Sequence, residues 1–208
     1  MGGLAGGIAA SVAATRVARA GQEPKPIVVP VGVTIAEREV EVDGKKTTAP
    51  VVPRSFVDDQ LARANEIFEP YAISFALRGE LRAADKKLAV LETRADRDAV
   101  CEAMVKGVAN LFFVTSLRDV DDPSRHRMGV TWRKLTNLKK KVVIVAASAL
   151  PTTLAHELGH YLGNDHTSVK NNLMSYDRDG AKVFLDATQG AKARKTAMGL
   201  FATKELLP

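Results

Sequence analysis

Three of the four histidines in this chain lie within eleven positions, in the segment LAHELGHYLGNDH at 154–166. His156 and His160 are four residues apart, a spacing that places two side chains on one face of an α-helix, one turn apart. Their ring nitrogens can then bind the same metal ion, at about 2.0 to 2.1 Å if the ion is zinc. The histidine spacing therefore predicts a metal site that is carried on a helix.

The third histidine of the segment, His166, lies beyond the expected end of that helix. In a continuous helix it would lie far along the axis from His156. Gly163 can adopt the left-handed conformation that ends a helix and reverses the chain, and this turn would bring His166 back toward the other two histidines. Three neutral imidazoles that leave one coordination position open are typical of a catalytic zinc site rather than a closed structural one.

Glu157 follows His156 directly and therefore lies off the line of the metal ligands. Its carboxylate can still reach a water molecule in the open position, and zinc lowers the pKa of such a water to about 7. We expect Glu157 to accept a proton as this water attacks a peptide carbonyl, and to pass the proton to the leaving amine. The segment thus predicts one catalytic Zn²⁺ ion and a hydrolase.

The same segment resembles a known motif. HELGHYLGNDH matches the pattern H-E-x-x-H-x-x-G-x-x-H of the metzincin zinc endopeptidases. That clan also has a downstream turn whose methionine forms an apolar floor under the metal, and NNLMSYD places Met174 eight residues after His166. The resemblance to matrixin-like and astacin-like catalytic domains implies a metalloendopeptidase that cuts protein or peptide substrates.

Tyr176 lies two residues after Met174, where some relatives have a tyrosine that binds zinc or stabilises the transition state. A structural role is the alternative for this residue. In the family, a strand shortly before the zinc helix forms the rim of the cleft, and the substrate adds to its free edge. RMGVTW is the corresponding segment here, so the resemblance implies substrate contacts at Gly129, Val130 and Thr131, with an ordinary turn or core role as the alternative for Gly129.

The elements around this segment follow from the apolar pattern. NLFFVTSL, MGVTW and KVVIVAAS are expected strands, and the last is continuously apolar, as in a strand buried on both faces. A helix is expected to open at Ser55, Asp43-Gly44 to form a hairpin turn, and Asp186 with Gln189 to cap a C-terminal helix. These elements predict an α/β (α+β) fold, a metzincin-like sandwich in which helices pack on a twisted mixed sheet. The active-site helix would be followed by the methionine turn and the C-terminal helix.

Composition limits the remaining function classes. The chain has 208 residues, of which 46% are hydrophobic, and its net charge is +6. Its Lys and Arg residues are scattered among Asp and Glu, which argues against nucleic acid as a partner. Residues 1–25 are expected to be a flexible Ala/Gly-rich tail or a degenerate signal segment, and 26–208 the catalytic domain. No stretch approaches the length of a membrane-spanning helix, and we expect a monomer.

The single cysteine, Cys101, excludes an internal disulfide. Secretion or another extracytoplasmic location is expected, with the cytoplasm as the alternative. Two acidic segments, 119–122 and 177–180, are candidates for Ca²⁺, but neither has a full set of oxygen ligands, and solvated turns are the alternative. A second function class is a domain that keeps zinc and binds peptides without cutting them. Glu157 argues against that class, because it adds nothing to metal ligation.

Overall fold

The centre of the molecule is a seven-stranded mixed sheet in the order β2-β1-β6-β9-β8, with β3 and β4 also paired to β1. This computed structural model describes residues 24–208, so the expected N-terminal tail falls almost wholly outside it. The main strands are β1 (Ile27–Val42), β2 (Lys45–Pro50), β3 (Ile73–Leu77), β4 (Arg82–Ala84), β6 (Ala109–Val114), β8 (Gly129–Arg133) and β9 (Lys141–Ala146). β5 (Val90–Leu91) and β7 (Ser116–Leu117) form a separate two-stranded sheet.

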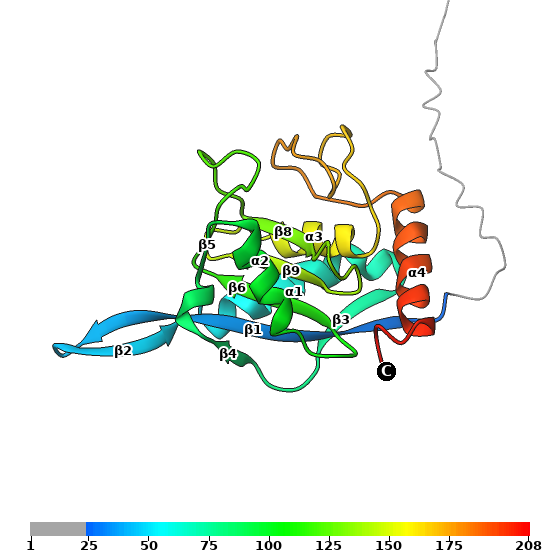
Figure 1. Ribbon diagram of the computed structural model, residues 1–208. Coiled ribbons are helices and arrows are strands. Elements are labelled where there is room, and N and C mark those ends of the chain that lie inside the picture. The colour runs from blue at the N-terminus through cyan, green and yellow to red at the C-terminus, as the bar shows by residue number, and fades with distance from the viewer. Residues whose placement is uncertain (1–23) are drawn as a thin grey trace, which may run out of the picture.

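Four α-helices pack against this sheet (Figure 1). They are α1 (Arg54–Phe68), α2 (Arg94–Glu102), α3 (Thr153–Tyr161) and α4 (Ala187–Ala202), with the short turns η1 (Glu69–Tyr71) and η2 (Lys86–Leu88). The arrangement confirms the predicted α/β class and its mixed, helix-covered sheet. Within the range 24–208, no helix is both long and apolar enough to cross a membrane.

The direction of the strands leaves β8 at an edge of the sheet. β1 runs parallel to β3, β4 and β6, and β6 runs parallel to β9. β8 is antiparallel to β9 and is the last strand on its side. At the opposite side, β1 and β2 form a hairpin that projects from the body of the molecule (Figure 1). Asp43 and Gly44 form its turn with φ values of 51° and 73°, as the Asp-Gly pair predicted.

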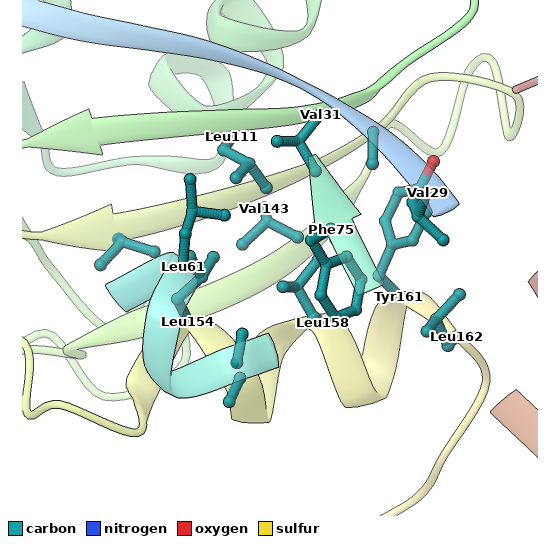
Figure 2. Packing of buried hydrophobic residues seen from close by; sticks show 14 of the residues in the cluster. Val29, Val31, Leu61, Phe75, Leu111, Val143, Leu154, Leu158, Tyr161 and Leu162 are labelled. Carbon is teal, nitrogen blue, oxygen red and sulfur yellow. The ribbon is translucent and has the colours of Figure 1, made fainter. Parts of the chain in front are cut away.

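Both faces of the sheet are buried along its strands β6 and β9. Val143 and Val145 of β9 join the cluster that includes α1, α3 and α4, part of which is shown in Figure 2. Val142 and Ile144 join a second cluster, on the face that α2 covers. Because successive side chains of a strand point to opposite faces, a strand covered on both sides must be apolar throughout. This confirms the interpretation of KVVIVAAS.

The helix starts were predicted with mixed success. Asp186 and Gln189 form a reciprocal capping box at α4, with Gln189 N donating to Asp186 Oδ1 at 2.8 Å. Ser55 was wrong as the start of α1, because the helix begins at Arg54 and no side chain caps it. Pro53 precedes the helix with φ −71° and ψ 160°. Its ring fixes φ, and its backbone carbonyl accepts a hydrogen bond from Phe56 N at 3.1 Å, so the first turn forms without a side-chain cap.

Candidate metal centre

The helix α3 is held in place by apolar packing along one side and by a tertiary cap at its start. Leu154, Leu158 and Tyr161 lie on one side of the helix and belong to the cluster under the sheet (Figure 2). The N-terminus of α3 has no side-chain cap of its own. Instead, the buried Gln60 of α1 accepts a hydrogen bond from Leu154 N at 3.0 Å and donates to Leu150 O at 2.9 Å. Gln60 thereby satisfies backbone groups that a helix end leaves free.

The chain reverses just after α3. Gly163 has φ +88°, in the left-handed region that favours glycine. Asn164 N donates to Gly159 O at 2.9 Å and Gly163 N donates to His160 O at 3.0 Å, which closes the turn. The chain that leaves this turn carries His166 back over the exposed side of the helix, beside His160.

The structure brings the three histidines of the segment together. Their Nε2 atoms lie 3.1 Å apart for His156 and His160, 3.0 Å for His160 and His166, and 3.3 Å for His156 and His166. His156 Nδ1 lies 2.7 Å from Leu173 O and His160 Nδ1 lies 2.8 Å from Asn164 O. A carbonyl only accepts, so these Nδ1 atoms carry the protons and the Nε2 atoms of both rings present lone pairs.

This donor set fits a zinc ion. Three ligands at about 2.05 Å from zinc, at tetrahedral angles, would be about 3.3 Å from one another, close to the separations of the three Nε2 atoms. Nitrogen lone pairs that face one another with no proton between them repel. A cation at the centre of the three Nε2 atoms would replace this repulsion with three bonds. Neutral imidazole is a preferred ligand of zinc, so the residues present match the metal that the spacing predicted.

Glu157 is positioned beside the three histidines by the edge strand. Thr131 Oγ1 lies 3.0 Å from Glu157 Oε2 and 2.7 Å from the Glu157 carbonyl. The residue is only 6% exposed, and burial raises the pKa of its carboxyl to about 7, while the hydrogen bonds from Thr131 act in the opposite direction. A cation bound nearby would favour the ionised form of this carboxyl.

The three residues expected to contact substrate lie on β8 but face different ways. A Cβ atom on Gly129 would lie 2.8 Å from Thr153 and 2.9 Å from Glu157, so β8 passes very close to α3 at this point. Thr131 points the same way and contacts Glu157. Val130 points to the opposite face of the sheet and packs against the second cluster.

The segment that contains Met174 packs beneath α3. Met174 is fully buried, and a Cβ atom added to Gly159 would collide with its sulfur, so it touches the helix between His156 and His160. Arg178 fixes this segment to the start of the helix. Its Nη1 donates to Thr152 Oγ1 at 3.0 Å, and its Nη2 donates at 2.9 Å to the same Leu173 carbonyl that His156 uses. No spacing rule in the sequence indicates Arg178.

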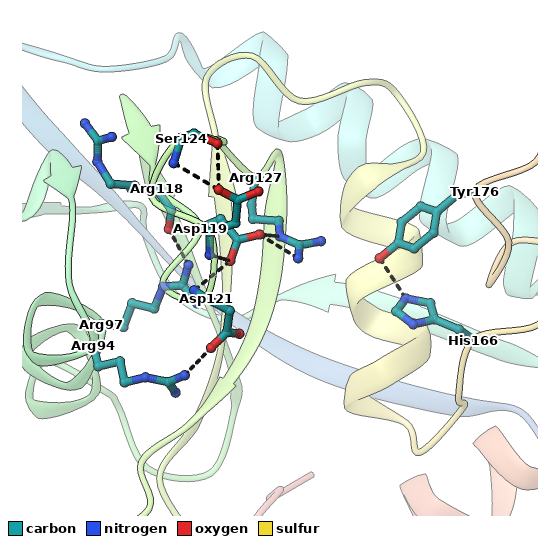
Figure 3. Close-up of polar contacts among 10 residues, drawn as sticks. Arg94, Arg97, Arg118, Asp119, Asp121, Ser124, Arg127, His166 and Tyr176 are labelled. Atoms are coloured by element: carbon teal, nitrogen blue, oxygen red, sulfur yellow. Dashed lines mark hydrogen bonds and ion pairs between the residues drawn. The ribbon is translucent and has the colours of Figure 1, made fainter.

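Tyr176 stands at the exposed side of the histidines. Its Oη lies 2.9 Å from His166 Nε2, and its side chain is 71% exposed (Figure 3). Arg127 lies on the opposite wall, where Nε donates at 2.7 Å to Oδ2 of the buried Asp119 (Figure 3). Cavities of about 470 Å³ and 360 Å³ adjoin the histidines, and Glu157 and Tyr176 line both of them. The geometry is a cleft with the three histidines at its centre.

The two acidic segments make other contacts. Asp119 pairs with Arg127, and Asp121 pairs with Arg94 at 2.5 Å. Asp179 accepts a hydrogen bond from Asn171 Nδ2 at 2.7 Å. Over residues 24–208, the three histidines form the sole cluster of potential metal ligands. Within the described residues these carboxylates take part in ion pairs and turns, and a calcium site at either segment stays a prediction.

Comparison with known proteins gives a likeness in fold. No protein-family model matches the chain, and no curated protein matches it in sequence. The crystal structure of metalloproteinase-II from Bacteroides fragilis is similar over 85% of this chain and 55% of that chain, with a TM-score of 0.54 and 15% identity. The chain thus spans little more than half the length of that protein. The fold is that of a metalloproteinase-like structure, and its three clustered histidines can hold a metal ion.

Metal affinity is expected to fall in acid. Burial lowers the pKa of His156 from 6.5 to about 4, and it also lowers the pKa of His160 and of His166. Because the pKa of each ring is lowered, the neutral, ligating form persists below pH 6.5, and for His156 it is lost as the pH falls through about 4. Competition with a zinc chelator that works in acid, from neutral pH to about pH 3, measures the effect. An affinity that stays constant down to about pH 3 would contradict ligation by imidazole.

Proposed function

We propose that residues 26–208 form the catalytic domain of a zinc-dependent endopeptidase of the metzincin type, which hydrolyses peptide bonds in proteins. One observation carries this proposal: the Nε2 atoms of three histidines converge at the centre of a cleft, beside the buried carboxylate of Glu157. The ligands would be His156, His160 and His166. The metalloproteinase-like fold supports the same conclusion.

Glu157 would act as the general base and then as the general acid. Bound zinc would supply Lewis-acid polarisation of the scissile carbonyl and would acidify the attacking water. Glu157 Oε accepts the proton of that water and delivers it to the leaving nitrogen. Without metal, burial raises the pKa of this carboxyl to about 7; a bound cation would lower it and so favour the ionised form, which accepts the proton. Thr131 holds Oε2 in place, so the base is oriented before the substrate binds.

The substrate would bind as an extended strand along β8. Within the described residues, β8 pairs with β9 on one side only, so its other edge is free to bind a peptide backbone. Gly129 and Thr131 place this edge next to Glu157. Met174 would form the apolar floor under the ligands, because it packs against α3 between His156 and His160.

Tyr176 would stabilise the negative charge that develops on the substrate oxygen. A side chain that is 71% exposed contributes little packing, and its Oη already lies 2.9 Å from a ligand nitrogen. We expect Tyr176→Phe to lower kcat by about 10²-fold, while zinc affinity and thermal stability stay close to those of the wild type. Steady-state kinetics and a zinc titration measure these values. An unchanged kcat would leave Tyr176 with a structural role.

Metal analysis coupled to a protease assay tests the proposed function. Purified protein is expected to contain one zinc per chain and to cut casein or a mixed peptide library. A chelator should abolish cleavage, and added zinc should restore it. Stoichiometric zinc without cleavage would instead indicate a domain that binds peptides, whereas protein that takes up no zinc would remove the basis of the proposal.

A further inference from the structure

The larger cavity beside the metal centre leads to two basic side chains. Its volume is about 470 Å³, and its wall includes Glu157, His160, Thr131, Arg133 and Lys141. Arg133 and Lys141 are direct partners in the pairing of β8 with β9. Partners across an antiparallel pair point to the same face, and here that face carries α3. The two positive charges therefore lie side by side, within the cavity that adjoins the proposed base.

Lys141 is buried without a partner of opposite charge. It is 8% exposed, and among residues 24–208 no carboxylate lies within 4.0 Å of its Nζ or of the Arg133 guanidinium. Burial and then the charge of Arg133 lower the pKa of Lys141 to about 8; Glu205 acts in the opposite direction but forms no ion pair with it. An unpaired buried ammonium that faces a second cation is unfavourable, and an anion between the two would remove the cost.

Helix capping accounts for only part of this arrangement. Lys141 Nζ donates to Tyr161 O at 2.8 Å, at the C-terminal end of α3, and lies 4.0 Å from the centre of the Tyr161 ring. A cation suits the C-terminus of a helix, but this contact uses one of three ammonium protons. It also gives no reason for a second cation, Arg133, at the directly paired position.

We propose that Arg133 and Lys141 form a carboxylate-binding pocket that selects substrates with an acidic group within about two residues of the bond to be cut. The inference rests on the proposed peptidase function and names its substrate class. Two sources share the required chemistry: the side chain of Asp or Glu within a peptide, and the free carboxylate at a peptide C-terminus. Arg133 follows Thr131, which contacts Glu157, by two residues of β8, so at about 3.3 Å per extended residue the bound carboxylate would lie within about two residues of the reacting carbonyl.

Matched peptides test this pocket. The two peptides of a pair differ only in having Glu or Gln at one position flanking the cleaved bond, and both are amidated at the C-terminus. Their cleavage is followed by mass spectrometry. For the zinc-loaded wild type, kcat/KM is expected to be at least about tenfold higher with Glu at one flanking position. A third peptide, which ends there in a free carboxylate, separates the two sources. If it is preferred over the internal Glu peptide, the pocket binds the chain terminus.

Variants assign the preference to the two residues. Lys141→Met and Arg133→Gln are each expected to bring the Glu/Gln ratio close to one. Lys195→Met is the matched control, because Lys195 is exposed on α4 and lines neither cavity of the cleft, and it should keep the ratio of the wild type. Arg133 is exposed, so its replacement tests the pocket even if Lys141→Met does not fold.

The outcomes separate this inference from the proposed function. Equal cleavage of Glu and Gln peptides by the wild type overturns the pocket and leaves the peptidase intact. If Lys141→Met lowers all rates and the melting temperature alike but keeps the ratio, Lys141 only caps the helix. If no peptide is cut, the proposed function fails. Fluorescence anisotropy of the same peptides, carrying a fluorescent label, then tests whether the pocket binds a carboxylate. Tighter binding of the Glu peptide than of the Gln peptide, with the difference lost in Arg133→Gln, supports the pocket. Equal affinities for the two peptides reject it.

Discussion

Glu157→Gln is expected to retain zinc and to lower kcat/KM by about 10²- to 10⁴-fold, the usual contribution of a general acid–base group. The amide keeps the size of the carboxylate and its contact with Thr131, but it cannot accept the proton of the attacking water. Zinc content by mass spectrometry and peptide hydrolysis measure the two effects. Glu41→Gln, at an exposed site on the β1–β2 hairpin, is the matched control and should change neither. Full activity in Glu157→Gln would remove the proposed base.

The same variant has a second expected effect, on the stability of the metal-free protein. Burial raises the pKa of Glu157 from 4.5 to about 7, so its neutral form stabilises the native state below about pH 4.5, and this stabilisation is lost as the pH rises through 7. Glutamine stays neutral, so at about pH 8 the variant should be more stable by roughly 2 to 3 kcal/mol. Denaturant unfolding with chelator present measures this difference. At about pH 4 it should vanish, and a difference that does not depend on pH would contradict this account.

His166→Ala is expected to weaken zinc binding by more than about 100-fold, because two imidazoles and water hold the ion less tightly than three imidazoles do. The chain contains a natural control, since His126 is the one histidine outside the segment, and it is exposed. His126→Ala should leave the zinc dissociation constant unchanged. Chelator competition on both variants gives the comparison.

The His166 variant also tests the turn after α3. His166 lies beyond the helix and reaches the other ligands only because the chain reverses at Gly163. If His166→Ala kept its zinc affinity, the ion would be held by His156 and His160 with other atoms, and the proposed three-histidine centre would be wrong. The two outcomes are far apart in magnitude, so a single titration separates them.

Much of the fold could be predicted because its causes are local in the chain. The strand β9 was identified from one continuous apolar run, the turn at Asp43 and Gly44 from two adjacent residues, and the α4 cap from a pair three residues apart. Each of these signals depends on backbone geometry within a few residues. The start of α1 was placed wrongly at Ser55: the helix begins at Arg54, directly after Pro53, and no side chain caps it.

The clustering of the three histidines could likewise be predicted from the sequence, because a four-residue spacing on a helix and a glycine turn bring three side chains together with little help from elsewhere. The contacts that hold these histidines and Glu157 in place could not be predicted from the sequence. Gln60 reaches α3 across 94 residues, and Thr131 reaches Glu157 across 26. Arg178 shares the Leu173 carbonyl with His156. Such partners meet only when separate elements pack, and many polar residues along the chain could make the same hydrogen bonds, so spacing cannot select among them.

The pairing of Arg133 with Lys141, which we propose to set substrate specificity, could not be predicted from the sequence either. Each looks like an ordinary solvated cation in the sequence, and eight positions separate them. The register of β8 against β9 places them opposite each other, and the packing of α3 buries one of them. The local pattern thus determined the clustering of the three histidines, because helix geometry fixes short spacings. The surroundings of the base and the charge of the cleft depended on packing between distant elements, because burial and strand pairing are properties of the assembled fold.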